Sequence, residues 1–218
     1  MTQRIVQMTD DGSATIFIPE MDEHYHSIKG ALTESNHIYR DCAFLHRSDG
    51  SRLRLLEVGF GTGLNATVTA MIADSNHPVH YITLEKYPVS EEVLSSLHYD
   101  NIVDKIIFDA IHHAPWDIPI EITPHFTIEK LHCDYTCDVL PHNIDVVYFD
   151  AFAPEKQPDM WTTEAFKRLY DTLNTGAVLT TYCAKGEIRR LLASTGFVVE
   201  RIAGPIGGKR EILRATKP

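Results

Sequence analysis

The sequence predicts an α/β protein with a doubly wound, mostly parallel sheet and helices on both of its faces. From Arg52 onward, apolar runs of strand length alternate with stretches of helical character, as in a parallel sheet wrapped by helices. A glycine-rich turn, GFGTG, joins one such run to a helical stretch. The chain has 218 residues and a hydrophobic composition of 44%, enough for one continuous core, so we expect a single domain over residues 1–218.

The first 50 residues predict a small extension of the core, which begins at residue 51. The segment RIVQMTDDGSATIFIP indicates two short strands around Asp11 and Gly12, a turn in which glycine tolerates positive φ. Residues 27–46 carry apolar side chains at helical spacing, interrupted near 33–36, which predicts one or two helices.

The core strands are expected at seven apolar runs: LRLLEV, VHYITLE, EITPHFTIEKLH, IDVVYFD, GAVLTTYC, FVVERIA and EILRAT. Helices are expected from about Leu64, after the glycine turn, and over TTEAFKRLYDTL. Proline and glycine gather at 115–124, 152–158 and 204–208, which predicts loops there.

Bulk properties predict a cytoplasmic protein. No apolar run is long enough to span a membrane, and the first residues lack the layout of a signal peptide. The four cysteines form no CxxC pair, which indicates free thiols in a reducing compartment.

The charge of the chain is unevenly distributed. A formal net charge of −10 argues against a general nucleic-acid coat protein, because such binding relies on clustered Lys and Arg. Residues 185–218 nevertheless hold eight basic and three acidic side chains. This asymmetry permits local contact with a polyanion, although solvated surface charge explains it equally.

The glycine turn predicts a ligand site. Gly59, Gly61 and Gly63 let the backbone turn sharply and approach a ligand, and the following helix start offers free N–H groups. Leu64 stands where a dinucleotide-binding pattern needs a further glycine, which favours a mononucleoside over NAD. A tight turn without a ligand remains the alternative.

Three acidic residues follow or lie within these strands. Glu85 ends its strand 22 positions after Gly63, the spacing of an acid that binds ribose hydroxyls, unless it is simply solvated at the rim. Glu57 lies inside an apolar strand, so it should meet backbone or ligand donors or a salt-bridge partner. Asp134 is placed to accept from an adenine amino group or to cap a helix over DYTCDVL.

The loop DAFAPEKQPDMWT, after the strand ending in Asp150, occupies the position where substrate lies over a cofactor. Phe152 and Trp161 are suited to flank a planar base, although Trp161 as a core residue of a structural loop is the alternative. In transfer from a sulfonium to an amine, a carboxylate such as Asp150 can orient the nitrogen and accept its proton.

These motifs together resemble the tRNA 5-(aminomethyl)uridine methyltransferase family, the methyltransferase half of the bifunctional wobble-uridine-modifying enzymes. The similarity runs through DEHYHSIKGALTESNHIY, LEVGFGTGLNA, LEKYP, YFDAFAPEKQPDMWT and GPIGGKREIL. It implies a class I methyltransferase fold that uses S-adenosylmethionine to methylate the aminomethyl group on the wobble uridine of tRNA.

The resemblance also implies roles for individual residues. Asp150 would face the methyl group and the acceptor amine. Phe152, Trp161, Lys209 and Arg210 would contact the RNA, the two basic residues at its phosphates or anticodon loop. The implied cofactor residues are Tyr25, Ser27, Glu57, Gly59, Gly61, Gly63, Asn65, Glu85 and Asp134.

The sequence departs from the family at two points. Gln157 replaces an Asn that is common in the loop, and we expect little effect because the amide is kept. The chain ends eight residues after Arg210, which predicts a stand-alone enzyme without the flavin-dependent oxidase half and without flavin. The sequence does not predict the oligomeric state.

A metal site and two other functions are the alternatives to this one. His132, Cys133, Cys137 and His142 lack the spacing of a zinc site, so no metal is expected. An aminopropyl transferase of the polyamine-synthase kind would share the fold but should show a paired acidic motif. A noncatalytic nucleoside- or RNA-binding module is the third possibility, against which the intact glycine turn, Glu85 and Asp150 argue.

Overall fold

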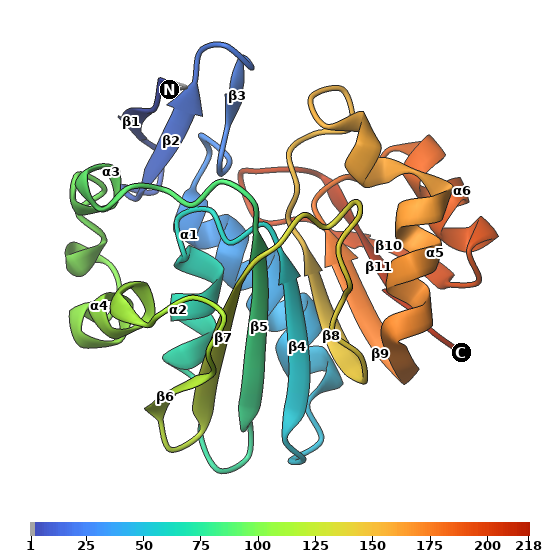
Figure 1. Cartoon of the computed structure of the whole chain (residues 1–218). Coiled ribbons are helices and arrows are strands. Elements are labelled where there is room, and N and C mark those ends of the chain that lie inside the picture. Colours follow the sequence, from blue (N-terminus) through green and yellow to red (C-terminus); the bar gives the residue numbers. More distant parts are fainter. Residues whose placement is uncertain (1–2) are drawn as a thin grey trace.

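Five parallel strands form the centre of the main sheet (Figure 1). The structure is a computed structural model that describes residues 3–218, apart from the side chain of residue 100. Within that part of the chain the sheet has eight strands in the order β10-β11-β9-β8-β4-β5-β7-β6. The pairings of β6 with β7, β11 with β9 and β10 with β11 are antiparallel. The predicted doubly wound, mostly parallel sheet is therefore confirmed.

The parallel strands match the predicted apolar runs closely. They are β4 (Leu53–Val58), β5 (Val79–Glu85), β7 (Phe126–His132), β8 (Ile144–Phe149) and β9 (Leu173–Thr181). The antiparallel strands are β6 (Ile120–Thr123), β10 (Val198–Ala203) and β11 (Glu211–Thr216).

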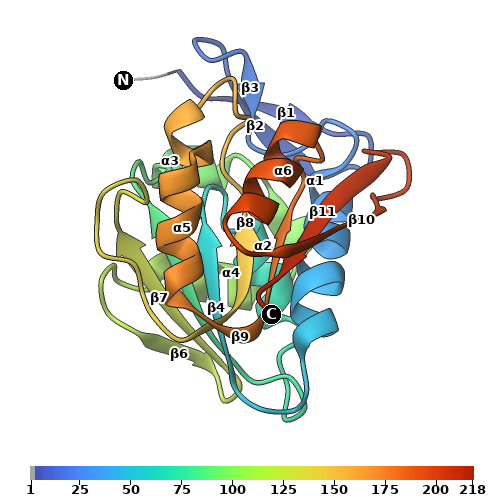
Figure 2. The same cartoon turned by 90° about the vertical axis from the view of Figure 1, so that its right-hand side faces the viewer.

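Helices cover both faces of this sheet. In Figure 2, α5 lies on one face and the blue helix that follows α1 lies on the other. One face carries α1 (Ala31–Glu34), the π-helix η1 (Ser35–Leu45), α2 (Leu64–Ala70) and α4 (Lys105–His113). The opposite face carries α5 (Thr163–Thr172) and α6 (Gly186–Ser194). Shorter helices are α3 (Glu91–Ser95), η2 (Tyr99–Asn101) and η3 (Pro158–Trp161).

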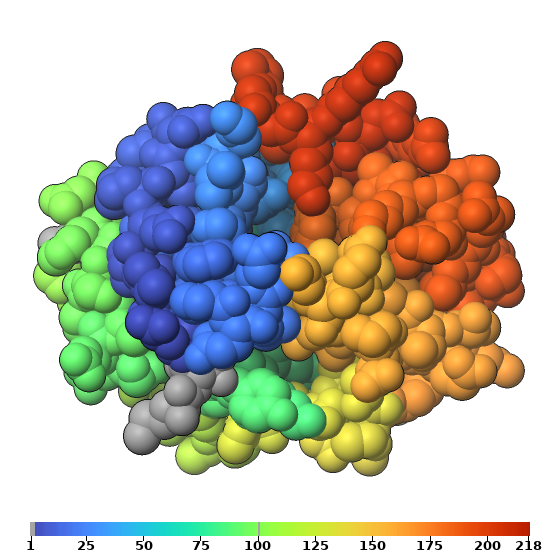
Figure 3. All heavy atoms as spheres, turned by 90° about the horizontal axis from the view of Figure 1, so that it is seen from above, coloured from blue at the N-terminus to red at the C-terminus, as the bar shows by residue number. Residues whose placement is uncertain are grey.

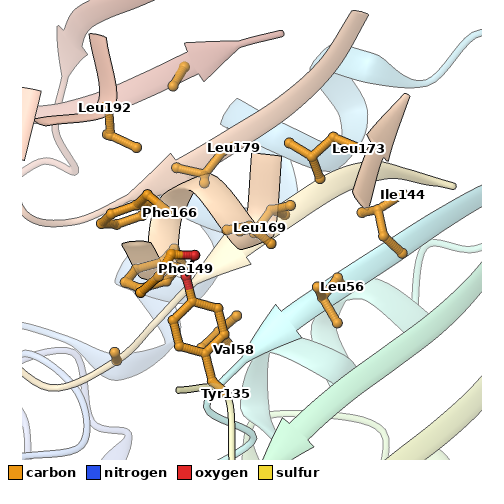
Figure 4. Packing of buried hydrophobic residues seen from close by; sticks show 14 of the residues in the cluster. Leu56, Val58, Tyr135, Ile144, Phe149, Phe166, Leu169, Leu173, Leu179 and Leu192 are labelled. Atoms are coloured by element: carbon orange, nitrogen blue, oxygen red, sulfur yellow. Dashed lines mark hydrogen bonds between the residues drawn. The ribbon is translucent and has the colours of Figure 1, made fainter. Parts of the chain in front are cut away.

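Side chains of β4 point alternately to the two faces of the sheet and so contribute to the hydrophobic core on each face. Leu56 and Val58 pack with α5 and α6, whereas Leu55 packs with η1 and α2. Phe149 of β8 meets Phe166 of α5 with 4.8 Å between ring centroids (Figure 4). A strand buried on both faces reads as a continuous apolar run, which is why the sequence pattern was clear.

The N-terminal extension forms a separate sheet of β1 (Ile5–Met8), β2 (Ala14–Ile18) and β3 (Glu23–His24). It lies above the ends of the parallel strands in Figure 1. The predicted hairpin at Asp11 and Gly12 is confirmed, with Gly12 at φ +81°. The third strand, β3, was not predicted because two residues are too short for a periodic pattern.

Three details differ from the expectations. The run EITPHFTIEKLH forms two antiparallel strands, β6 and β7, because the chain turns at Pro124 and His125. The helix is not interrupted near residues 33–36, because α1 continues directly into η1 there. The segment DYTCDVL forms turns rather than a helix.

No helix within residues 3–218 combines the length and apolarity needed to cross a membrane.

Candidate functional site

The glycine turn lies against the beginning of the loop that follows β8. Gly59 has φ +94°, and a Cβ atom there would come within 2.8 Å of the carbonyl oxygen of Asp150. Only glycine satisfies both the dihedral angle and this close approach. The turn and the loop therefore meet where the carboxyl ends of β4 and β8 lie side by side.

A cavity of about 410 Å³ opens at this edge of the sheet. Its wall includes Gly59, Gly61, Glu85, Asp134 and Asp150. The volume falls in the range of small-molecule sites, and the lining combines apolar side chains with a few polar groups. The predicted cofactor residues are thus partly gathered around one space.

Glu85 holds the glycine turn as well as facing the cavity. Its Oε2 accepts a hydrogen bond from the Gly61 N–H at 3.0 Å, and its Oε1 accepts from the Tyr87 N–H at 2.8 Å. Each carboxylate oxygen has a further lone pair for ribose hydroxyls. Glu85 is therefore bound to the protein backbone, not merely solvated at the rim.

Asp134 also combines two roles that the sequence left open. It lines the cavity, yet its Oδ1 accepts from the backbone N–H and the hydroxyl of Thr136 and so caps a turn. Its Oδ2 pairs with the Lys86 ammonium at 2.7 Å. These contacts, the Lys86 hydrogen bond foremost, hold the pKa of Asp134 well below its usual value.

The N-terminal extension closes over the cavity. His26 is buried, and its Nε2 lies 2.7 Å from the Thr62 hydroxyl in the glycine turn. Burial lowers the pKa of His26 to about 4, so the ring is neutral at pH 7. Tyr25 meets Phe152 edge to face, with 5.1 Å between ring centroids. The extension is therefore joined to both the glycine turn and the loop after β8.

A second cavity of about 290 Å³ lies on the other side of this contact. Viewed from above, a hollow lies on each side of the place where the N-terminal segment meets the loop after β8 (Figure 3). Residues common to both cavities are Tyr25, His26, Asp150, Ala151 and Phe152. We call the larger space the first cavity and the smaller one the second cavity.

Asp150 stands at the junction of the two cavities with both carboxylate oxygens held. Oδ1 accepts a hydrogen bond from the Tyr39 hydroxyl at 2.6 Å, and Oδ2 accepts from Asn65 Nδ2 at 2.8 Å. Burial raises the pKa of Asp150 to about 6, against the lowering effect of these hydrogen bonds. A carboxylate fixed in this way can orient a nucleophile that approaches from the second cavity.

Some predicted site residues lie outside both cavities. Trp161 is buried in the core, and its Nε1 donates to the Phe152 carbonyl at 2.8 Å. Its position agrees with the alternative of a core residue that supports the loop. Gln157 lines the first cavity and supports the same loop, because its Oε1 accepts from the Phe152 N–H at 3.1 Å. Phe152 itself lines both cavities.

The remaining predicted site residues either line the second cavity or line neither cavity. Ser27 lines the second cavity and not the first. Gly63 contacts neither, because it packs against His112 of α4. Lys209 lines the second cavity, with its ammonium 3.9 Å from the ring centroid of Tyr182. Arg210 is exposed beside it and lines neither space.

Glu57 and Asn65 lie beneath the first cavity. Both are buried, and neither lines it. Glu57 accepts a 2.7 Å hydrogen bond from the Thr83 hydroxyl, and burial raises its pKa to about 8. Glu57 Oε1 and Asn65 Oδ1 have no hydrogen-bond partner among the described residues. A proton on Glu57 would allow its carboxyl to donate to the Asn65 carbonyl, which leaves the Asn65 NH₂ for Asp150.

Sequence reasoning missed Glu34, Tyr39 and Tyr182. Tyr39 holds Asp150, and Tyr182 donates to the Ala151 carbonyl at 2.9 Å. Glu34 is buried at the wall of the second cavity. No local sequence pattern marks these residues, because their role depends on packing across the sheet.

Among residues 3–218, no three His, Cys, Asp or Glu side chains are grouped so as to hold a metal ion. The four cysteines are free thiols.

Comparisons with known proteins show similarity to methyltransferases. Residues 123–218 match the family model described as S-adenosyl-L-methionine-dependent methyltransferase. The structure is similar to that of MNMC2 from Aquifex aeolicus, with a TM-score of 0.78 at 23% identity over 99% of this chain and 71% of that one. The chain therefore has the class I methyltransferase fold.

The sequence is more specifically similar to bifunctional proteins named for tRNA 5-methylaminomethyl-2-thiouridine biosynthesis, MnmC. The protein of Burkholderia thailandensis is 32% identical over 98% of this chain and 35% of its own length. That of Pseudomonas fluorescens is 31% identical over 88% of this chain and 32% of its own length. The chain spans about a third of these relatives, and it resembles their methyltransferase half. The family resemblance seen in the sequence is confirmed.

A spermidine synthase from Thermotoga maritima shares the fold, with a TM-score of 0.61 at 13% identity over 98% of this chain and 72% of that one. This likeness concerns the architecture alone.

Proposed function

We propose that the chain transfers a methyl group from S-adenosylmethionine to the exocyclic amine of 5-aminomethyluridine, or its 2-thio form, at the wobble position of tRNA in the cytoplasm. The observation that carries the proposal is the position of Asp150, a half-buried carboxylate that lines two adjoining cavities. The names of the bifunctional relatives supply the substrate class.

The first cavity fits the cofactor. Glu85 offers carboxylate oxygens for ribose hydroxyls, Asp134 lies at the neighbouring strand end for the adenine amino group, and Gly59 and Gly61 leave room beside Asp150. A Cβ atom on Gly61 would lie 3.0 Å from the Tyr25 ring, so the absence of a side chain keeps this wall open. When bound, the cofactor supplies an electrophilic methyl group.

The second cavity fits the amine. Asp150 orients the acceptor nitrogen through its fixed carboxylate, and Tyr39 and Asn65 keep that carboxylate in place. The amine must be neutral to attack, so a group of the second cavity has to receive its proton. Tyr25 and His26, with Phe152 opposite, exclude water from the point where the cavities meet.

The charge of the second cavity argues against an aminopropyl transferase. Glu34 and Asp150 would suit a polyamine, but the Lys209 ammonium lies in the same cavity. Burial lowers the pKa of Lys209, while Glu34, Glu23 and Asp150 favour its charged form. A polyamine carries several positive charges and no phosphate, so Lys209 repels it, whereas Lys209 attracts the phosphates that flank a nucleoside.

The basic C-terminal loop supports RNA as the partner. Lys209 and Arg210 are adjacent in the exposed segment between β10 and β11. Their charges lie at the mouth of the second cavity, where the phosphates that flank an inserted nucleoside would pass. We therefore assign tRNA contact to this segment.

Methyl transfer from labelled cofactor to tRNA that carries 5-aminomethyluridine tests the proposal. We expect label in the wobble nucleoside with the wild type, and no turnover with unchanged cofactor affinity for Asp150→Ala. Asp159→Ala, an exposed acid of the same loop, is the matched control and should behave as wild type. The Lys209→Ala, Arg210→Ala double variant should lose tRNA affinity while retaining cofactor affinity.

Two negative results would have different meanings. A wild-type protein that binds the cofactor and labels no such tRNA refutes the acceptor. Transfer of an aminopropyl group from decarboxylated cofactor to putrescine would instead establish the polyamine reaction.

A further inference from the structure

We propose that Glu34 is a second catalytic residue, the carboxylate that removes the proton from the substrate ammonium in the second cavity while Asp150 orients the nitrogen. This inference rests on the proposed function and assigns the proton-transfer step within it.

Glu34 is positioned by an unusual piece of helix. It is the last residue of α1, directly before the π-helix η1. π-helical segments are rare and are frequently found at functional sites, because they shift side chains from their regular positions. Here the shift places Glu34 and Tyr39 toward the same loop after β8, although they are five residues apart.

One oxygen of Glu34 is fixed and the other is available. Oε2 accepts a hydrogen bond from the Ser27 N–H at 2.8 Å. The hydrogen bond from Ser27 leaves Oε1 available to a ligand in the second cavity. The side chain lines the second cavity although the residue is only 7% exposed. A carboxylate at the wall of a cavity with an available oxygen is suited to bind a cationic ligand.

Asp150 is less suited to the same task. Each of its oxygens already accepts a strong hydrogen bond, from Tyr39 and from Asn65. Such bonds favour the charged form and so weaken the carboxylate as a proton acceptor. We therefore assign orientation of the substrate nitrogen to Asp150 and acceptance of its proton to Glu34.

The surroundings of Glu34 suit a reversible proton transfer. Burial, and next the charge of Asp150, raise the pKa of Glu34 to about 7. The Ser27 hydrogen bond and the charge of Lys209 act in the opposite direction. The titratable groups that face the second cavity from the surrounding elements are Glu23, His24, Tyr25, His26, Asp150, Tyr182 and Lys209. A base with a pKa near 7 can take a proton and return it to water between turnovers.

The proposed step balances. The substrate ammonium gives one proton to Glu34 Oε1 and becomes a neutral amine. Its lone pair forms the new N–C bond as the S–C bond of the sulfonium breaks, and the sulfur keeps that electron pair. The products are a secondary ammonium and S-adenosylhomocysteine, and Glu34 later releases its proton to solvent.

Glu34→Gln is the decisive variant, because its amide oxygen can still accept from Ser27. We expect unchanged affinities for cofactor and tRNA. The single-turnover rate at pH 7 should fall about 10²-fold or more, as for other losses of a general base. The wild-type rate should level off above about pH 7, whereas the variant rate should keep rising into the alkaline range, where solvent deprotonates the amine. Glu164→Gln, on the exposed face of α5, is the matched control.

Chemical rescue provides a second test. Glu34→Ala should regain part of its rate with added acetate, and Asp150→Ala should not. A Glu34→Gln enzyme with the wild-type rate and pH profile overturns the proposal and leaves the proposed function intact. A wild-type enzyme that methylates no 5-aminomethyluridine tRNA overturns both.

Discussion

The hydroxyl of Tyr39 donates a 2.6 Å hydrogen bond to Oδ1 of Asp150, although the two residues are 111 positions apart in the sequence. Tyr39 comes from the π-helix on one face of the sheet, and Asp150 follows the central strand β8. Burial, and then the charge of Asp150, raise the pKa of Tyr39 well above its usual value. The hydroxyl therefore remains a donor at every pH at which the protein would work.

Tyr39→Phe should weaken catalysis without weakening cofactor binding. The hydrogen bond from Tyr39 favours the charged form of Asp150, so its loss raises the pKa of Asp150 further above about 6. We expect the single-turnover rate at pH 6 to fall about tenfold, with a smaller loss at pH 8, in line with about 1.4 kcal/mol per pKa unit. Rates measured between pH 5 and pH 9 give the shift, and an unchanged profile would contradict it.

Glu57→Gln should remove a pH dependence from folding stability. The pKa of Glu57 is raised from 4.5 to about 8 in the folded protein, so the folded state holds a proton that the unfolded state releases between these values. Stability contributed by this group is present below about pH 4.5 and is lost as pH rises toward 8. We expect the Gln variant to gain in Tm over the wild type as pH increases from 5 to 8, measured by thermal denaturation. If the Tm of the wild type and that of the variant change equally with pH, Glu57 takes up no proton on folding.

Gly59→Ala should destabilise the protein and impair the site. The new Cβ would clash with the Asp150 carbonyl, and φ +94° is strained for alanine. We expect a loss of about 3 kcal/mol in the free energy of unfolding, together with weaker cofactor binding. Gly176→Ala is the control, because φ is +78° but nothing lies within 4 Å of its Cβ, so only about 1 kcal/mol should be lost. Urea titration of both variants measures the difference. Equal losses in the free energy of unfolding would show that the close approach to the Asp150 carbonyl has no effect on stability.

Trp161→Phe should mainly lower stability, whereas Phe152→Leu should mainly weaken tRNA binding. Trp161 is buried and holds the Phe152 carbonyl, so its replacement should lower the free energy of unfolding by about 2 kcal/mol with little change in KM for tRNA. Phe152 faces both cavities, and its loss should raise KM for tRNA about tenfold with a smaller effect on stability. The opposite pattern in denaturation and steady-state assays would restore Trp161 to the binding surface.

The sequence predicted those features that local pattern determines. Strand β4, the glycine turn and the start of α2 follow from apolar runs and glycine spacing, and Glu85 was found because it ends a strand. Glu34 and Tyr39 were missed because their role depends on the register of a π-helix and on its packing across the sheet, which no local pattern shows. Trp161 illustrates the same limit, because burial decided between two roles that its residue type allowed equally.

The contact between Tyr25 and Phe152 has a kinetic consequence. These two rings line both cavities, and the surface is hollowed on either side of the place where the N-terminal segment meets the loop after β8 (Figure 3). With the proposed function, spent cofactor would leave from the first cavity and methylated RNA from the second. Separate openings would let the methyl donor be exchanged while the RNA stays bound, which corresponds to a random order of product release.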